Sequence, residues 1–186
     1  LGRMGSALAK SFSRAGHKVT GWNRSAGPRD AAAGFCTPVQ DIADAVAASD
    51  LIVTCLADYD STMEALSGVS VDQWTGRTMV QLASGGPDDA HAMKAWADER
   101  AIAYIDGAIA TFPDRMGNAD TCIFMSGDSA AHGRHEATLA AMGGRNLFTG
   151  DDVAAAASLD LAWLSLLYGV TLGMLSAAAF CEAGGV

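Results

Sequence analysis

The candidate catalytic residues are an aspartate and a tyrosine in a long apolar stretch near the C-terminus. Asp160 is the only formally charged residue between Asp152 and Glu182. A carboxylate on such a segment is costly to bury unless it is paired or protonated, which makes it a candidate for function. Tyr168 follows eight residues later, about 12 Å along a helix axis. The two polar groups therefore bracket an apolar surface that leaves room for a small apolar molecule.

The residues between these two polar groups fall on the same helical face. Trp163, Leu164 and Leu167 stand three, four and seven positions after Asp160, so they form one apolar patch. An alternative assigns no chemistry: Asp160 caps or pairs near the helix start, and Tyr168 is a core aromatic with a satisfied hydroxyl. Spacing alone favours this alternative, so the catalytic interpretation depends on the other motifs of the chain.

The N-terminal residues are typical of a dinucleotide-binding turn. Residues 1–5 read LGRMG, the second half of a G-x-G-x-x-G motif. In such a turn Gly2 lets the backbone approach a pyrophosphate, Gly5 lets the helix pack on its strand, and the helix N-terminus holds the negative charge. Gly2, Arg3 and Met4 are therefore candidate cofactor-binding residues. Two glycines at this spacing also occur by chance, so the context has to support the motif.

The context is a helix, a turn and a strand, followed by three polar residues. Residues 6–15 read as a helix, Gly16 as its C-cap and residues 17–22 as a strand. NAD-binding units usually place a carboxylate at the end of this strand. The chain has instead the cofactor-binding candidates Asn23, Arg24 and Ser25, which can donate hydrogen bonds to a 2′-phosphate that a carboxylate would repel. We therefore expect NADPH rather than NADH; without the glycine turn these residues would be an ordinary polar turn.

Composition excludes several classes of partner. The chain has 186 residues and a net charge of −9, which disfavours nucleic acid and anionic membranes. The four cysteines are far apart without C-x-x-C spacing, which indicates reduced thiols and a cytoplasmic protein without a cysteine metal site. His132 and His135 are close enough to share a metal, but they lie in a solvated helical segment, so no metal is expected.

Alternating elements predict an α/β fold of the Rossmann type, a doubly wound parallel sheet. Strands are expected at 51–56, 78–82, 103–106 and 121–126, most of them short apolar runs that suit strands covered on both faces, and a brief strand is expected at 145–148. Ser61 and Glu64 have the spacing of a capping box, and Pro87 is expected in the first turn of a helix that ends near Arg100. Another helix is expected over 128–142. The NADP-binding domain is assigned to residues 1–150.

The rest of the chain, residues 151–186, is expected to form one long helix. Residues 152–183 contain neither proline nor strand signals, and as a helix they would extend for about 45 Å. Residues 161–180 carry no charge, and Gly169 and Gly173 have the spacing of a membrane dimer motif. The acidic flanks argue against a membrane span. We therefore expect a helix buried between protein surfaces, supplied by a further domain or a second subunit.

Six short runs are spread along the chain, at residues 1–5, 22–25, 55–60, 82–87, 106–109 and 159–162. Together they resemble imine reductases, which belong to the β-hydroxyacid dehydrogenase superfamily together with 6-phosphogluconate dehydrogenase. The resemblance implies a Rossmann domain, a long interdomain helix and a C-terminal helical bundle exchanged within a homodimer. It also implies NADPH as hydride donor and reduction of the C=N bond of a cyclic imine to an amine.

The resemblance also assigns roles to individual residues. Asp160 matches the proton-donor or iminium-anchoring position, and Tyr168 matches a substrate-pocket residue. Ser84 matches a polar position beside the nicotinamide, and the backbone of Cys55 and Leu56 would line the nicotinamide ribose. These five residues complete the candidate site.

Two departures and two alternatives accompany the resemblance. Pro28 stands where a phosphate-binding lysine is common, which leaves Arg29 as a substitute. The long helix lacks the lysine of the hydroxyacid dehydrogenases, and residues 109–113 replace their carboxylate-binding turn. A β-hydroxyacid dehydrogenase or aldehyde reductase, and a non-catalytic NADPH-binding dimerisation module, are the alternatives. The first Rossmann strand and the C-terminal helical domain are expected to be missing, as in a fragment cut at both ends.

Overall fold

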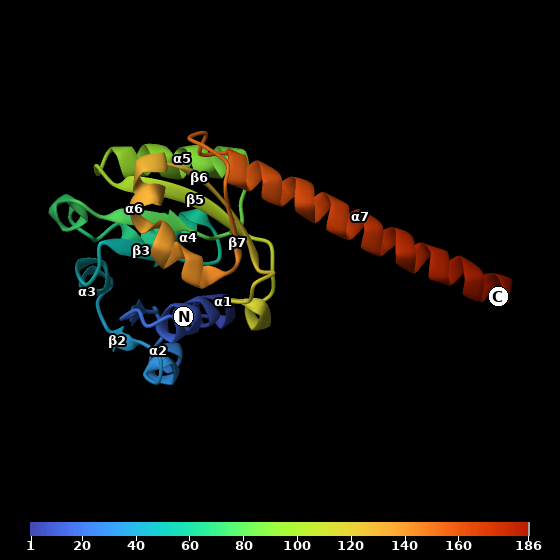
Figure 1. Cartoon of the computed structure of the whole chain (residues 1–186), viewed down its shortest axis with the longest axis horizontal. Helices are drawn as coiled ribbons and strands as arrows, with labels where there is room; N and C mark the ends of the chain where they lie inside the picture. The colour runs from blue at the N-terminus through green and yellow to red at the C-terminus, as the bar shows by residue number, and fades with distance from the viewer. Residues whose placement is uncertain (186) are drawn as a thin grey trace.

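Strands and helices alternate over residues 1–185, which the computed structural model describes (Figure 1). The strands are β1 (Thr20–Trp22), β2 (Thr37–Val39), β3 (Leu51–Thr54), β4 (Thr78–Gln81), β5 (Ala103–Ile109), β6 (Cys122–Gly127) and β7 (Arg145–Phe148). The α-helices are α1 (Arg3–Arg14), α2 (Ala26–Ala32), α3 (Ile42–Ala47), α4 (Tyr59–Leu66), α5 (Pro87–Asp98), α6 (Ser129–Leu139) and α7 (Ala155–Gly184). The α/β class is therefore confirmed.

The sheet is mostly parallel, but one pair of strands is not. Its five strands are ordered β3-β4-β5-β6-β7, and β1 pairs with β2 in a separate parallel pair. The β5–β6 pair is antiparallel, so the expectation of a wholly parallel sheet is wrong at this point. The reason lies in the connection, which holds only the short 3-10 turn Pro113–Arg115 and no crossover helix that could return the chain in the same direction.

Alternating side chains of the central strands fill two cores, one on each face of the sheet. Met79 and Tyr104 belong to the core under α3, α4, α5 and the first turns of α7. Val80 and Ile105 belong to the opposite core, which α1 and α6 cover. This period of two also places Asp106 on the same face as Tyr104. Buried hydrogen bonds tie the elements together: the Gln81 amide accepts from Thr54 at 2.6 Å and donates to Thr62 at 3.1 Å.

Several boundaries differ from the expected ones. Helix α1 begins at Arg3, because Gly2 is its extended N-cap residue. Helix α4 begins at Tyr59, and the Asp58 carboxylate accepts from the Ser61 backbone N–H at 2.7 Å. The capping box expected at Ser61 is therefore wrong, since a carboxylate three residues earlier already caps the helix. Elements α2, β2 and α3 are short and lie where no element was expected.

Helix α7 leaves the domain after its second turn and extends away from it (Figure 1). Ala156, Ala157 and Asp160 are buried against the domain, whereas large apolar side chains further along, such as Met174 and Phe180, are about 70–80% exposed. The helix is long and apolar enough to cross a membrane by length and composition alone. The protein surfaces expected to bury it are not among residues 1–185. Burial between such surfaces stays a prediction.

Candidate functional site

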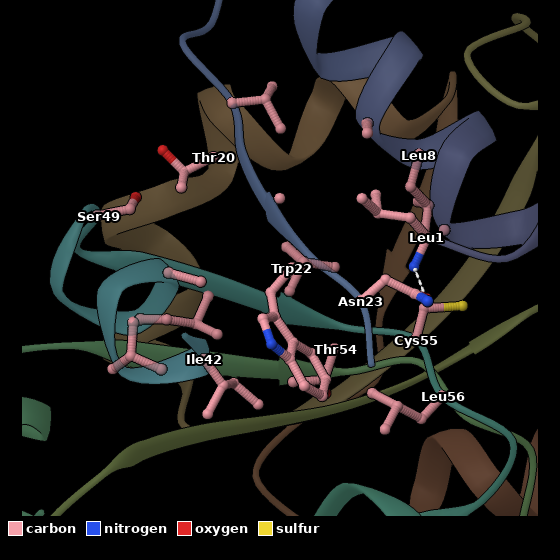
Figure 2. A pocket seen from close by; sticks show the side chains of 18 of the residues that line it. Leu1, Leu8, Thr20, Trp22, Asn23, Ile42, Ser49, Thr54, Cys55 and Leu56 are labelled. Carbon is pink, nitrogen blue, oxygen red and sulfur yellow. Dashed lines mark hydrogen bonds between the residues drawn. The ribbon is translucent and has the colours of Figure 1, made fainter. Parts of the chain in front are cut away.

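A cavity of about 1040 Å³ lies where α1, β1 and β3 meet. Eight of the nine predicted cofactor-binding residues line it: Gly2, Arg3, Met4, Asn23, Arg24, Ser25, Cys55 and Leu56. Figure 2 shows how Leu1, Asn23 and Cys55 gather at one end of this cavity, although they come from three different segments. The structure therefore brings the glycine turn, the polar turn and the end of β3 together.

The deeper part of the cavity is apolar. Leu8, Val19, Leu51 and Val53 line it between β1 and β3, two strands that are not paired with each other in the described residues. A strand ahead of Leu1 stays a prediction. The polar groups that could bind a small molecule lie at the mouth of the cavity, which is formed by the glycine turn, the polar turn after β1 and the end of β3.

The N-terminus of α1 presents free backbone donors to the mouth of the cavity. The N-cap residue Gly2 makes no side-chain capping hydrogen bond, and the first turn holds no acidic residue. A Cβ at Gly2 would meet nothing within 4 Å, so a ligand can approach this backbone closely. The first N–H groups of a helix lack intrahelical partners and carry partial positive charge, which favours a phosphate.

The polar turn after β1 is braced from within. The Nη1 of Arg29, in the last turn of α2, donates to the Asn23 carbonyl oxygen at 3.1 Å. The Asn23 amide donates to the Ser25 carbonyl oxygen at 3.2 Å and accepts from the Leu1 amine at 2.8 Å (Figure 2). Arg24 and Ser25 are exposed at the cavity mouth, so their side chains are available to an anion. Arg29 thus supports the turn through one of its donors, and its role as a substitute for the lysine stays a prediction.

The end of β3 contributes mainly backbone to the cavity. The Cys55 carbonyl oxygen lies 4.0 Å from where a Cβ at Gly5 would be, so the two segments approach closely. Burial raises the pKa of the Cys55 thiol, which keeps it protonated and a weak nucleophile. Cys55 and Leu56 are therefore placed to contact a ligand without reacting with it.

Ser84 lies outside this cavity. It is exposed in the turn between β4 and α5, with Gly85 and Gly86 after it. The turn is fixed at its other end, because Gly86 N–H donates to the Asp89 carboxylate at 2.8 Å. The contact of Ser84 with a nicotinamide stays a prediction.

Asp160 and Tyr168 have different environments. Asp160 is 5% exposed at the anchored end of α7, and this burial raises the pKa of its carboxyl. Tyr168 is 61% exposed on the projecting part of the same helix. Between them, Trp163 and Leu164 are half-buried and Leu167 is exposed. The structure therefore supports Asp160 as an unusual carboxyl and leaves the role of Tyr168 a prediction.

A buried aspartate with two tyrosines lies in the core that α7 covers, and sequence reasoning gave it no role. Tyr59 and Tyr104 hydroxyls donate to the same Asp106 oxygen, Oδ1, at 2.8 and 2.7 Å. The other oxygen, Oδ2, is buried without a hydrogen-bond partner. Burial raises the pKa of Asp106 to about 6, although the two tyrosine hydrogen bonds oppose the shift. A charged residue inside an apolar strand run was the signal that could have revealed this cluster.

The described part of the chain holds no group of three or more metal-ligating side chains. His132 stacks on Phe148 with ring centroids 4.3 Å apart, and the His135 ring nitrogen lies 3.1 Å from the Thr78 hydroxyl. The two histidines thus have separate partners. All four cysteines are free thiols.

The residues present fit a phosphorylated dinucleotide. The uncapped N-terminus of α1 can hold a pyrophosphate, and exposed Arg24 and Ser25 can hold a further phosphate. No carboxylate lines this mouth at the end of β1, where it would repel such a phosphate. These residues fit such a ligand because they supply hydrogen-bond donors for its phosphates and because the space beside Gly2 is open.

Comparison with known proteins identifies relatives over the full chain. Residues 1–150 match the model of the NAD binding domain of 6-phosphogluconate dehydrogenase. An NADPH-dependent reductive aminase from Aspergillus oryzae is 29% identical over 185 residues, which is 99% of this chain and 62% of the relative.

Two solved structures have the same fold over the entire chain. An imine reductase from Myxococcus stipitatus in complex with NADP+ is 37% identical with a TM-score of 0.93, and 65% of its length is covered. An imine reductase from Aspergillus terreus in complex with NADPH4 and dibenz[c,e]azepine is 34% identical with a TM-score of 0.93, again with 65% covered. The chain thus spans a little under two thirds of the length of these relatives.

Proposed function

Because the chain belongs to the family of NAD binding domains of 6-phosphogluconate dehydrogenase, we propose that it forms the cofactor domain of an NADPH-dependent imine reductase. Within this proposal, residues 1–150 are the NADP-binding domain and residues 151–186 the start of a long interdomain helix. The substrate is a small, predominantly cyclic imine, which is reduced to an amine. The similar imine reductases and reductive aminases support this activity.

The observation that carries the proposal is the convergence of three segments on one cavity mouth. The α1 N-terminus supplies backbone donors for a pyrophosphate, and Arg24 and Ser25 supply donors for a 2′-phosphate. The backbone of Cys55 and Leu56 closes the same mouth from the end of β3. This combination favours NADPH over NADH, because nothing at the end of β1 selects an unphosphorylated ribose.

The chemistry at the other end of the site depends on Asp160. Bound NADPH supplies the hydride that adds to the imine carbon. The nitrogen then needs one proton, and the Asp160 carboxyl can hold it because burial raises the pKa of this group. Tyr168 orients the substrate on the apolar side of α7, and Ser84 contacts the nicotinamide. An apolar wall of Trp163 and Leu164 excludes water from the reacting atoms.

The exposed apolar length of α7 is the basis for the assembly that we propose. A helix that is apolar on all sides requires partners on all sides. We propose a C-terminal helical domain that packs on α7 in a domain-swapped homodimer, which would cover Tyr168 and complete the substrate pocket. We also propose a cytoplasmic location without membrane insertion, in keeping with four free cysteines and the net charge of −9.

The test is a substrate panel on protein that carries this chain together with its C-terminal helical domain. Cyclic imines, carboxylated aldehydes and hydroxyacids are offered with NADPH and NADH, and cofactor absorbance is followed. Imine-dependent oxidation of NADPH, faster than that of NADH, is the expected result. Turnover of the carboxylated aldehydes alone would instead indicate a hydroxyacid dehydrogenase or aldehyde reductase, and cofactor binding without turnover would indicate a binding module.

A further inference from the structure

The turn that carries Ser84 leaves the sheet beside the loop that lines the cofactor cavity. Strands β3 and β4 are parallel, and their last residues, Thr54 and Gln81, are partners in register. The Leu82 N–H donates to the Thr54 carbonyl oxygen at 2.9 Å, so the pairing continues past the end of β4. Cys55 and Ser84 thus follow neighbouring strands at their carboxyl ends, the edge of an open α/β sheet where ligands bind.

Tyr59 packs directly on the backbone of this turn. It is the first residue of α4, the helix that follows the loop with Cys55, and it is 4% exposed. A Cβ at Gly85 would lie 2.5 Å from Cε2 and 2.7 Å from Cδ2 of the Tyr59 ring. Because the ring stands against the residue next to Ser84, it limits how far the turn can move towards α4.

A buried carboxylate fixes the ring of Tyr59. The Tyr59 hydroxyl donates to Oδ1 of Asp106 at 2.8 Å, and Asp106 is fully buried on β5. Asp106 is the register partner of Gln81, so it belongs to the strand pair from which the turn leaves. Tyr104 donates to the same oxygen at 2.7 Å. Breaking such a buried bond leaves a polar group unpaired, which holds the ring in one position more firmly than packing alone.

The turn depends on contacts from outside because it contains two glycines in a row. Gly85 and Gly86 have no side chain that restricts their backbone, so this segment has many conformations of its own. The Asp89 carboxylate accepts from the Gly86 N–H at 2.8 Å and fixes the side of the turn next to α5. The Tyr59 ring packs against Gly85 and closes the other side. Ser84 is exposed directly before the glycines and takes its position from these contacts.

We propose that Tyr59 is a positioning residue for the nicotinamide half of the cofactor, because its ring, held by Asp106, keeps the Ser84 turn in place beside the end of β3. The other half, adenosine with its phosphates, binds at the α1 N-terminus and at residues 23–25. Loss of the Tyr59 ring therefore weakens the binding of one half and spares the other. This inference rests on the NADPH site and the Ser84 contact proposed above.

Tyr104 provides a matched control. Its hydroxyl bonds to the same Asp106 oxygen and its side chain is 1% exposed, so either tyrosine contributes one hydrogen bond to the same carboxylate. Of the two rings, only that of Tyr59 is among the atoms nearest to a Cβ at Gly85. Tyr59→Leu and Tyr104→Leu each remove a buried ring. Tyr59→Phe and Tyr104→Phe remove only a hydroxyl, and this pair decides the question if a leucine variant does not fold.

The experiment measures dissociation constants by calorimetry on protein that carries this chain together with its C-terminal helical domain. NADPH occupies both halves of the cofactor site, whereas adenosine 2′,5′-bisphosphate, which lacks the nicotinamide, occupies only the glycine turn and the polar turn. We expect Y59L to weaken NADPH binding about tenfold and to leave the bisphosphate within about twofold of the wild type. Y59F keeps the ring but frees it from Asp106, so its loss for NADPH should be about threefold. Y104L and Y104F should leave both constants near wild type.

Four outcomes would overturn the inference. They are equal losses for the two ligands in the Tyr59 variants, which indicate structural damage only; an unchanged NADPH affinity in those variants; equal losses in the Tyr59 and Tyr104 variants; and a wild type that binds NADPH no more tightly than the bisphosphate. The imine reductase proposal fails separately, as a wild type that shows the expected binding but turns over no imine.

Discussion

The ring of Tyr59 occupies the space that a side chain at Gly85 would need. The nearest approach, 2.5 Å between Cε2 and an ideal Cβ, is shorter than side chains tolerate, and the Asp89 carboxylate is only 2.9 Å from the same point. The tyrosine cannot easily move aside, since its hydroxyl is held by Asp106. Position 85 therefore has to be glycine, because the ring of Tyr59 leaves no room for a side chain there.

Gly85→Ala should therefore destabilise the domain and disturb the Ser84 turn. Overpacking of this kind costs about 1–3 kcal/mol. Unfolding in urea should show this loss, and the KM for NADPH should rise if the turn contacts the nicotinamide. Gly68→Ala is the matched control, because a Cβ at Gly68 meets nothing within 4 Å. Equal stability of the two variants would contradict the packing argument.

The buried carboxyl of Asp106 should make stability depend on pH. Burial raises its pKa from 3.8 to about 6, so its contribution is fully present below about pH 4 and is lost as pH rises through about 6. A shift of two units corresponds to about 3 kcal/mol. Urea unfolding between pH 4 and 8 should show a stability difference between wild type and Asp106→Asn that changes by this order.

An exposed carboxyl provides the control for that measurement. Asp151→Asn removes the same charge from the surface, and its difference from the wild type should vary far less over the same pH range. A constant difference between wild type and Asp106→Asn would show that Asp106 is not the group that carries the dependence.

Asp160→Asn should lower turnover while cofactor binding persists. General acid catalysis contributes about 100- to 10,000-fold, so kcat for imine reduction should fall by at least the lower figure. The Kd for NADPH should stay near the wild-type value, since the cavity lined by the glycine turn does not include Asp160. Unchanged turnover would show that Asp160 is not the proton donor.

Arg24→Ala should weaken NADPH binding without a matching effect on NADH. A charge-assisted hydrogen bond to a phosphate is worth about 1.5–3 kcal/mol, which corresponds to roughly a 10- to 150-fold rise in Kd. Arg14→Ala, at the exposed far end of α1, removes an equal charge and should leave both affinities near wild type. Equal losses for the two cofactors would show that Arg24 does not read the 2′-phosphate.

Sequence patterns predicted those strands and helices that can be recognised from their own residues. Apolar runs marked most of the strands β3 to β6, because strands covered on both faces read as short apolar runs in the sequence. The direction of β6 was missed, since it depends on a connection without a helix rather than on the strand residues. The capping of α4 was assigned to Ser61, because a serine and a glutamate three apart fit the motif as well as Asp58 does.

The candidate site was predictable where it uses turns and unpredictable where it uses tertiary contact. Gly2 and Asn23 belong to segments whose role follows from local sequence, and the structure brings them to one cavity. The hydrogen bond from Tyr59 to Asp106 joins α4 and β5 and spans 47 residues. No local pattern records such a pairing.

The N-terminal turns of helix α7 are anchored to the domain, and the rest of the helix extends away from it, so Asp160 lies close to the anchored end. The helix is about 45 Å long, and Asp160 lies about 7 Å from its start. A rotation of about 10° about the anchored turns would carry the far end through about 8 Å but Asp160 through only about 1 Å. A displacement of the far end would therefore reach the Asp160 carboxyl reduced to roughly a sixth.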